Sequence, residues 1–167
     1  MTNEKQTAIN AIEAKKDLIC QVSDHIWSHP ELSLQEEDSA SYYCQILEQE
    51  GFQVERGICG IPTAFSASYG NGSPRIGILA EYDALSGLSQ EAGSLVQKEI
   101  VPGGCGHGCG HNLLGAGAFG AALGVRAYLE ETGHEGTVIL YGCPGEEGGA
   151  AKAFMAREGL WKSLDAA

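Results

Sequence analysis

The sequence predicts an α/β fold in which helices pack against a sheet. Two helical segments open the chain, several apolar segments of strand length follow, and a long helix rich in small residues separates two of these strands. Helices that alternate with buried strands are typical of layered α/β domains. The chain has 167 residues, which suits one domain, and no long repeat or linker divides it.

The first expected helix is recognised from the spacing of its apolar residues. Ala8, Ile12 and Ile19 begin one apolar face, and this face continues to Ile26 before Pro30 ends the helix. We therefore expect one continuous helix from the start of the chain to the His-Pro pair.

The second expected helix begins near Ser33 and ends before Gly51. Ser33 and Glu36 match the S-x-x-E capping box, and Gly51 occupies the position after the last turn. The acidic run Glu36-Glu37-Asp38 falls in the first turn, where the helix dipole favours negative charge. We interpret this run as a solvated helix start.

The remaining elements alternate between strands and helices. The dipeptide Asn71-Gly72 predicts a tight turn between two of the strands. The small residues of the long helix predict close packing on the sheet, and Ser163–Ala167 turns apolar again. The expected strands are 52–56, 63–69, 75–80 and 136–143, and the expected helices are 112–131 and 150–157.

The charge balance excludes two classes of partner. The net charge is −12, so the chain is expected to repel nucleic acid and anionic membranes, and no basic patch offsets this field. No apolar run approaches the length of a membrane span, and the polar start of the chain resembles no secretory leader. We therefore expect a cytoplasmic protein with neither a nucleic acid nor a membrane as partner.

Metal-ligating residue types are concentrated in one glycine-rich segment. Cys105-Gly106-His107 is followed at once by Gly108 and then by Cys109-Gly110-His111, directly before the long helix. Thiolate and imidazole are preferred zinc donors, and glycine lets backbone crowd around an ion. Four ligands within seven residues leave little room for one tetrahedral site, so we expect one or two ligands from this segment and others from distant loops.

Carboxylates follow two of the expected strands. Glu146-Glu147 comes after the strand 136–143, and Glu81-Tyr82-Asp83 comes after the strand 75–80. Open α/β sheets place their sites at the carboxyl ends of strands. Adjacent carboxylates repel one another unless a cation or water relieves the repulsion, so one acid can bind metal while its neighbour acts as a general base.

These motifs, in this order, resemble the M20 peptidase family of di-metal amidohydrolases and exopeptidases. The resemblance rests on Glu81-Tyr82-Asp83-Ala84-Leu85, on Gly108-Cys109-Gly110-His111-Asn112 and on Gly142-Cys143-Pro144-Gly145-Glu146-Glu147-Gly148-Gly149. It covers nearly the whole chain and points to the branch of aminobenzoyl-glutamate hydrolases and related dipeptidases. It implies the three-layer catalytic domain of a di-zinc exopeptidase.

The resemblance also implies roles for individual residues. Cys109, His111 and Glu147 would be metal ligands, with Cys109 bridging two ions, and Glu146 would be the general base. Asp83 matches the acid that orients a ligand. Glu81 stands where many members have a histidine ligand. His107 matches a histidine common just upstream of the motif, whereas Cys105 has no counterpart.

The implied activity is hydrolysis of an amide bond. Two divalent ions, zinc or manganese, would polarise the carbonyl of an N-acyl amino acid, an aminobenzoyl-glutamate-like molecule or a dipeptide. Family members are much longer than this chain: they add a lid or dimerisation domain and two further histidine ligands. We therefore expect residues 1–167 to be the N-terminal part of a catalytic domain, inactive by itself, from a full-length homo- or hetero-oligomer.

Two other interpretations remain open from the sequence. One is a non-catalytic fragment, or a subunit that works only with a partner chain carrying the missing ligands. The other is a thiol hydrolase with Cys109 as nucleophile, although Cys109 and His111 are too close in sequence for their side chains to reach each other without strain.

Overall fold

The computed structural model describes residues 2–167 and contains the expected alternation of helices and strands. The strands are β1 (Gln53–Arg56), β2 (Phe65–Asn71), β3 (Arg75–Ala80) and β4 (Gly136–Gly142). The helices are α1 (Asn3–Ala14), α2 (Lys16–Ser28), α3 (Glu37–Gln49), α4 (His111–Thr132) and α5 (Ala151–Arg157). Two short 3-10 helices cover Ile58–Gly60 and Leu160–Ser163.

The sheet has the strand order β1-β2-β4-β3. Strand β4 pairs antiparallel with β2 and parallel with β3, and α4 supplies the crossover that a parallel pair requires. The Asn71-Gly72 turn does connect β2 to β3, but β4 lies between these strands. Asn71-Gly72 therefore makes a local turn, but β2 and β3 do not pair with each other as a hairpin.

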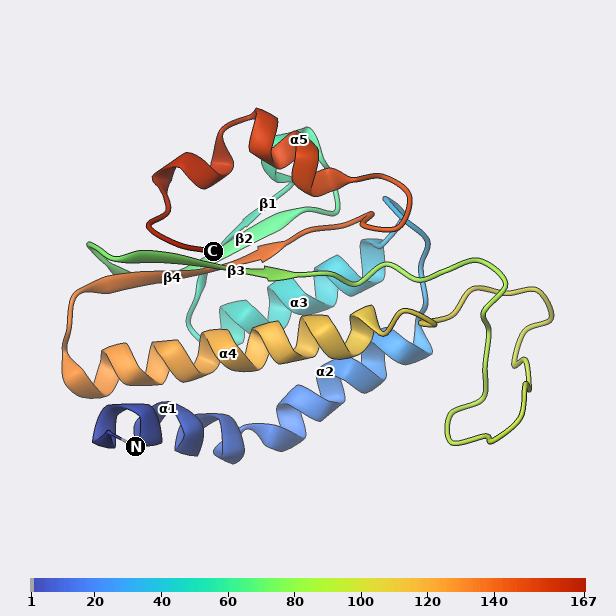
Figure 1. Cartoon of the computed structure of the whole chain (residues 1–167), viewed down its shortest axis with the longest axis horizontal. Coiled ribbons are helices and arrows are strands. Elements are labelled where there is room, and N and C mark those ends of the chain that lie inside the picture. Colours follow the sequence, from blue (N-terminus) through green and yellow to red (C-terminus); the bar gives the residue numbers. More distant parts are fainter. Residues whose placement is uncertain (1) are drawn as a thin grey trace.

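The helices cover both faces of this sheet, as Figure 1 shows. Helices α3 and α4 contact one face, α5 lies over the other face, and α1 and α2 pack on the side of α4 away from the sheet. Every residue of β4 is buried, because this strand is covered on both faces. The segment between β3 and α4 projects from one end of the molecule as a long loop (Figure 1).

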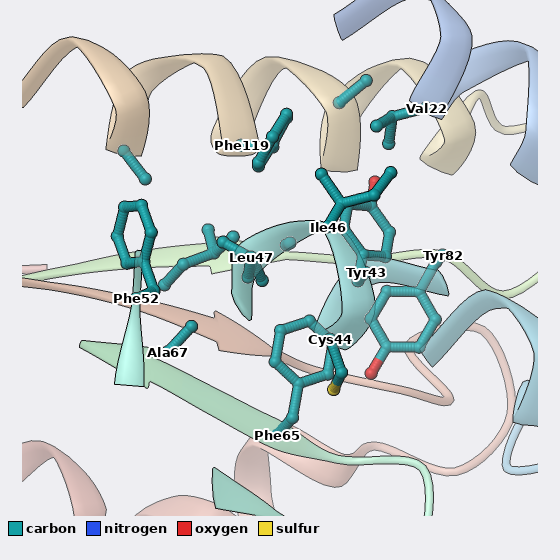
Figure 2. Packing of buried hydrophobic residues seen from close by; sticks show 14 of the residues in the cluster. Val22, Tyr43, Cys44, Ile46, Leu47, Phe52, Phe65, Ala67, Tyr82 and Phe119 are labelled. Atoms are coloured by element: carbon teal, nitrogen blue, oxygen red, sulfur yellow. The ribbon is translucent and has the colours of Figure 1, made fainter. Parts of the chain in front are cut away.

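The main core lies between the sheet and helices α2, α3 and α4. Aromatic rings fill it: Tyr43, Phe65 and Tyr82 contact one another, and Phe119 reaches down from α4 (Figure 2). A smaller core lies beneath α5, where the Tyr141 ring meets the Trp161 ring edge to face. The two cores hold the sheet from opposite sides and fix where its strand ends lie.

The small residues of α4 serve helix packing more than sheet packing. A Cβ at Gly120 would lie 3.0 Å from Ile19, and one at Gly124 would lie 2.9 Å from Ile12. Gly115 instead faces the sheet side, where a Cβ would lie 2.6 Å from the backbone oxygen of Glu81. The small face therefore lets α1 and α2 approach α4 closely.

Two predictions about the first helices were wrong. The chain breaks into α1 and α2 at Lys15, whose backbone leaves the helical region (φ −104°, ψ 8°). This break lets both halves lie along α4. Ser33 also makes no capping box, since the Glu31 carboxylate caps α3 instead, accepting from the backbone N–H groups of Asp38 and Ser39 at 2.9 Å each.

The acidic run at the start of α3 is not uniformly solvated. Glu36 is fully buried, while Glu37 and Asp38 are exposed. At the other end of the chain, the backbone oxygen of Ala166 accepts from Gly77 at 2.9 Å, so the last residues lie beside β3. No helix within residues 2–167 combines the length and apolar character needed to cross a bilayer.

Candidate metal centre

The candidate site lies where the carboxyl ends of β3 and β4 meet. Ala80 and Gly142 are register partners at this edge, so the residues that follow them emerge side by side. The first of these segments carries Glu81 and Asp83, and the second carries Glu146 and Glu147. Helix α4 begins at the same edge, because it runs back along the sheet between the two parallel strands.

His111, the first residue of α4, is the centre of the site. Its side chain is 3% exposed, and Nδ1 lies 3.0 Å from both the backbone oxygen and Oδ1 of Asp83. Both of these atoms are acceptors, so Nδ1 carries the proton and donates it. This bond fixes the ring and directs Nε2 toward the other carboxylates.

Three carboxylates surround the Nε2 atom of His111. Glu81 lies 3.0 Å away, Glu146 lies 3.7 Å away and Glu147 lies 3.9 Å away. A side chain with a lone pair, surrounded by anionic oxygens, is the arrangement that a cation stabilises.

Cys109 adds a thiol to this cluster. Its Sγ, a ring nitrogen of His111 and a carboxylate oxygen of Glu147 lie within 4.8 Å of one another. The hydrogen bond to Glu147 and then burial raise the pKa of the Cys109 thiol above its ordinary value. The structure thus brings together the three residues that the family resemblance implies as ligands.

A second triad overlaps the first. Ligand atoms of Glu81, His111 and Glu146 also lie within 4.8 Å of one another. Both triads share His111, whose Nε2 has one lone pair and can bind one ion. The two acids after β4 therefore belong to different triads, and Glu146 is the more exposed of them, at 42% against 25% for Glu147.

Asp83 links the parts of the site. Besides holding His111, its Oδ2 atom accepts from the Ser33 hydroxyl at 2.8 Å and from the backbone N–H of Glu147 at 2.9 Å. Ser33, expected to cap a helix, is therefore used to hold this buried carboxylate. Asp83 contacts two of the candidate ligand residues and positions them relative to each other.

Glu36 positions the turn that carries the two acids after β4. Its Oε1 atom accepts from the backbone N–H groups of Gly145 at 2.7 Å and Leu34 at 2.9 Å, and Oε2 accepts from the Thr63 hydroxyl at 3.1 Å. Burial raises its pKa, while these bonds oppose the rise. The sequence gives no sign of this role, since a glutamate in a helix-start motif carries no signal of a contact more than a hundred residues away.

The first copy of the Cys-Gly-His repeat lies outside the metal-ligand cluster. The Cys105 thiol donates to the Pro30 backbone oxygen at 3.0 Å, and His107 Nε2 donates to the Ile26 backbone oxygen at 3.0 Å. Burial lowers the pKa of His107. This copy ties the loop to the end of α2.

A further group of His25, His29 and Asp38 has ligand atoms within 4.8 Å of one another. The His25 and His29 rings are stacked, with centroids 4.4 Å apart and planes 24° apart. Lone pairs in near-parallel rings do not converge on one point, so we assign this group no metal. His29 instead caps α2, with Nδ1 donating to the backbone oxygen of His25 at 2.9 Å.

The residues at the β3–β4 edge fit a divalent ion. The donor set combines thiol, imidazole and carboxylate, the three ligand types that zinc takes in proteins. His111 also has the carboxylate contact at its other nitrogen that metal-bound histidines have. The excess of acidic groups over basic groups around Nε2 supports the same fit.

Comparison with known proteins defines the class of this chain. The sequence model of peptidase family M20/M25/M40 matches residues 77–167, which include both strand ends and the repeat. The chain belongs to this family, and the resemblance seen in the sequence is confirmed.

Among individual relatives, the chain is 52% identical over 158 residues to one of the subunits of the p-aminobenzoyl-glutamate hydrolase of Escherichia coli K12. This match covers 95% of the chain and 33% of that protein. The chain is 31% identical to Xaa-Arg dipeptidase of Mus musculus, covering 96% of the chain and 36% of that protein. It thus spans about a third of the length of these curated relatives.

Solved structures agree on the fold. A putative aminohydrolase from methicillin-resistant Staphylococcus aureus superposes with a TM-score of 0.73 at 24% identity, covering 96% of this chain and 40% of that one. The YXEP protein of Bacillus subtilis, described as a dinuclear metal binding peptidase of the M20 family, has a TM-score of 0.70 at 24% identity, with 91% and 42% coverage. The predicted α/β sheet-and-helix fold is confirmed.

Proposed function

We propose that residues 1–167 form the N-terminal part of the catalytic domain of a metal-dependent amidohydrolase. The substrate class is an N-acyl amino acid, an aminobenzoyl-glutamate-like molecule or a dipeptide, whose amide bond is hydrolysed. The similarity to p-aminobenzoyl-glutamate hydrolase and to Xaa-Arg dipeptidase supports this class. A cytoplasmic location and zinc or manganese as the ion belong to the same proposal.

One observation carries the proposal: ligand atoms of Cys109, His111 and Glu147 lie within 4.8 Å of one another, although the first two residues come from the start of α4 and the loop before it, and the third from the turn after β4. These residues would hold an ion, and further ligands for a second ion would come from outside residues 1–167. A bound divalent ion polarises an amide carbonyl and lowers the pKa of water.

Three acidic residues of this chain would orient the ligands and accept the proton of the attacking water. Asp83 keeps the Nδ1 proton of His111 and thereby presents Nε2 as a ligand. Glu147 is anchored through its backbone N–H to Asp83. Glu146 is the more exposed acid and would take the proton from the attacking water.

A partner-dependent subunit is a second candidate. The relative with 52% identity is itself named as one subunit of a hydrolase, and the chain spans a third of its length. In this case the chain would contribute its three ligands to a site completed by a homo- or hetero-oligomeric partner. A thiol hydrolase has less support, because the Cys109 thiol lies against the Glu147 carboxylate, which disfavours the thiolate.

Zinc titration of the 167-residue chain tests the metal site. We expect one Zn²⁺ to bind through Cys109 and His111, and we expect amide hydrolysis by this chain to stay below detection because ligands are missing. Failure to bind Zn²⁺ would reject the site. Robust hydrolysis abolished by a chelator would support the hydrolase and reject the incomplete-domain proposal.

The two acids after β4 test the division of roles. Glu147→Gln should weaken Zn²⁺ binding, since a ligand that loses its charge loses attraction for the ion. Glu146→Gln should keep the metal, and in an active longer form it should lower the rate by about 10²–10⁴-fold, as is typical when a general base is removed. Metal content and rate are measured on both variants, and the reverse pattern would exchange the two roles.

A further inference from the structure

Lys152, on α5, is a basic side chain built into an otherwise acidic site. Its Nζ atom forms an ion pair with Oε1 of Glu81, while Oε2 of the same carboxylate faces His111. Among residues 2–167, no other lysine or arginine pairs with a carboxylate of the two triads. Glu81 and Lys152 are 12% and 35% exposed, so solvent screens this pair only in part.

The ion pair affects the two triads unequally. The oxygen-rich triad contains Glu81 with Glu146, whereas the thiol triad contains Cys109 with Glu147. Both need the single Nε2 lone pair of His111. Lys152 neutralises a ligand of the oxygen-rich triad and pairs with neither Cys109 nor Glu147.

The two triads also prefer different ions. Thiolate and imidazole favour Zn²⁺, whereas carboxylates favour Mn²⁺. We propose that Lys152 determines metal choice at this site by offsetting the charge of Glu81 and occupying one of its two oxygens, which makes Glu81 a weaker ligand, so that the ion binds the thiol triad and Zn²⁺ is selected over Mn²⁺. This inference rests on the proposed metal site and adds a residue that sets its specificity.

Binding of the ion to the thiol triad also leaves the Glu146 carboxylate without a bound ion. If the ion used the oxygen-rich triad, Glu146 would be a ligand, and its negative charge would be committed to the ion and would make it a weaker base. With Glu81 held by Lys152, Glu146 stays available for the proton transfer proposed above. Lys152 is thus a positioning residue that acts through Glu81.

Metal selectivity of Lys152 variants tests the inference. Binding of Mn²⁺ alone is followed by the loss of its free-ion electron paramagnetic resonance signal, and binding of Zn²⁺ alone by competition with a chromogenic chelator. Lys152→Met should raise Mn²⁺ affinity about tenfold and Zn²⁺ affinity less than about threefold, because only the oxygen-rich triad regains the full negative charge of its Glu81 carboxylate. Lys152→Arg keeps the charge and should match the wild-type chain in both measurements.

A second experiment checks which triad binds Mn²⁺ in the Lys152→Met variant. In the Lys152→Met background, Cys109→Ser should leave Mn²⁺ affinity unchanged, because the ion now binds Glu81, His111 and Glu146. If Lys152→Met does not fold, as judged by circular dichroism, Lys152→Gln replaces it in both experiments.

Three results would overturn the inference. They are unchanged Mn²⁺ affinity in Lys152→Met, an equal rise for both ions, and loss of Mn²⁺ binding on adding Cys109→Ser. In each of these cases wild-type Zn²⁺ binding would stay intact, and the proposed function would survive. A wild-type chain that binds neither ion would instead overturn the metal site itself, and the inference with it.

Discussion

The two copies of the Cys-Gly-His repeat have the same residues and spacing but different surroundings. In the second copy, His111 lies within 4 Å of four carboxylates, and Cys109 lies beside one of them. In the first copy, His107 and Cys105 donate to backbone oxygens near the end of α2. Ligand-type residues therefore form a candidate metal site only where the sheet edge supplies acids.

The middle glycines of the two copies differ in the same way. Gly106 is needed for space, since a Cβ there would lie 2.1 Å from the backbone oxygen of Leu88. Gly110 has open space around it but a φ of +91°, which non-glycine residues avoid. One glycine lets the loop pack against itself, and the other lets the chain turn into α4 with His111 facing the acids.

Substitution of the two histidines should give the largest difference in Zn²⁺ affinity between the two copies of the repeat. His111→Ala should lower Zn²⁺ affinity by at least about 100-fold, more than the loss of an outer-shell partner causes. His107→Ala should change Zn²⁺ affinity less than about threefold, since His107 pairs with backbone, but should lower the free energy of unfolding by about 1–2 kcal/mol. Chelator competition and urea unfolding measure both effects. Equal losses of Zn²⁺ affinity would show that both copies bind the ion.

The glycines should give the next largest difference. Gly106→Ala should destabilise the fold by about 2–3 kcal/mol, because the new methyl group meets fixed backbone. Gly110→Ala should cost about 1 kcal/mol, because only the backbone conformation is strained.

Asparagine is the matched control for both glycines, since it tolerates positive φ. Gly110→Asn should recover part of the loss, whereas Gly106→Asn should be at least as unstable as Gly106→Ala. Urea unfolding compares the four variants. If asparagine restored stability at both positions, Gly106 would not be required for lack of space, and the proposed difference between the two glycines would be wrong.

The cysteines should show the smallest stability effect. Cys105→Ser should change the free energy of unfolding by less than about 1 kcal/mol, because serine can still donate to Pro30. Zn²⁺ should protect Cys109, but not Cys105, from alkylation as read by mass spectrometry. Protection of Cys105 would place it in the ion's ligand set and contradict the comparison.

Much of the fold follows from local pattern in the sequence. The strands, the long helix before β4 and the placement of acids after β3 and β4 were all predicted within a few residues. The break at Lys15 was not predicted, because it depends on the packing of α1 and α2 along α4. The Glu31 cap of α3 was not predicted, because Glu31 lies seven residues before Asp38, outside the spacing of the capping-box motif. A pattern of apolar residues records which face is buried but not what covers it.

The site shows the same division between sequence and tertiary structure. The sequence by itself determined the ligand types and, through the family motif, favoured Cys109 and His111 over the first copy. Only the tertiary structure decided that Ser33 holds Asp83, that Glu36 fixes the turn before Glu146, and that Lys152 pairs with Glu81. Local periodicity carries no information about such contacts, because each joins residues 50 or more positions apart, and packing between the sheet and its helices alone brings them together.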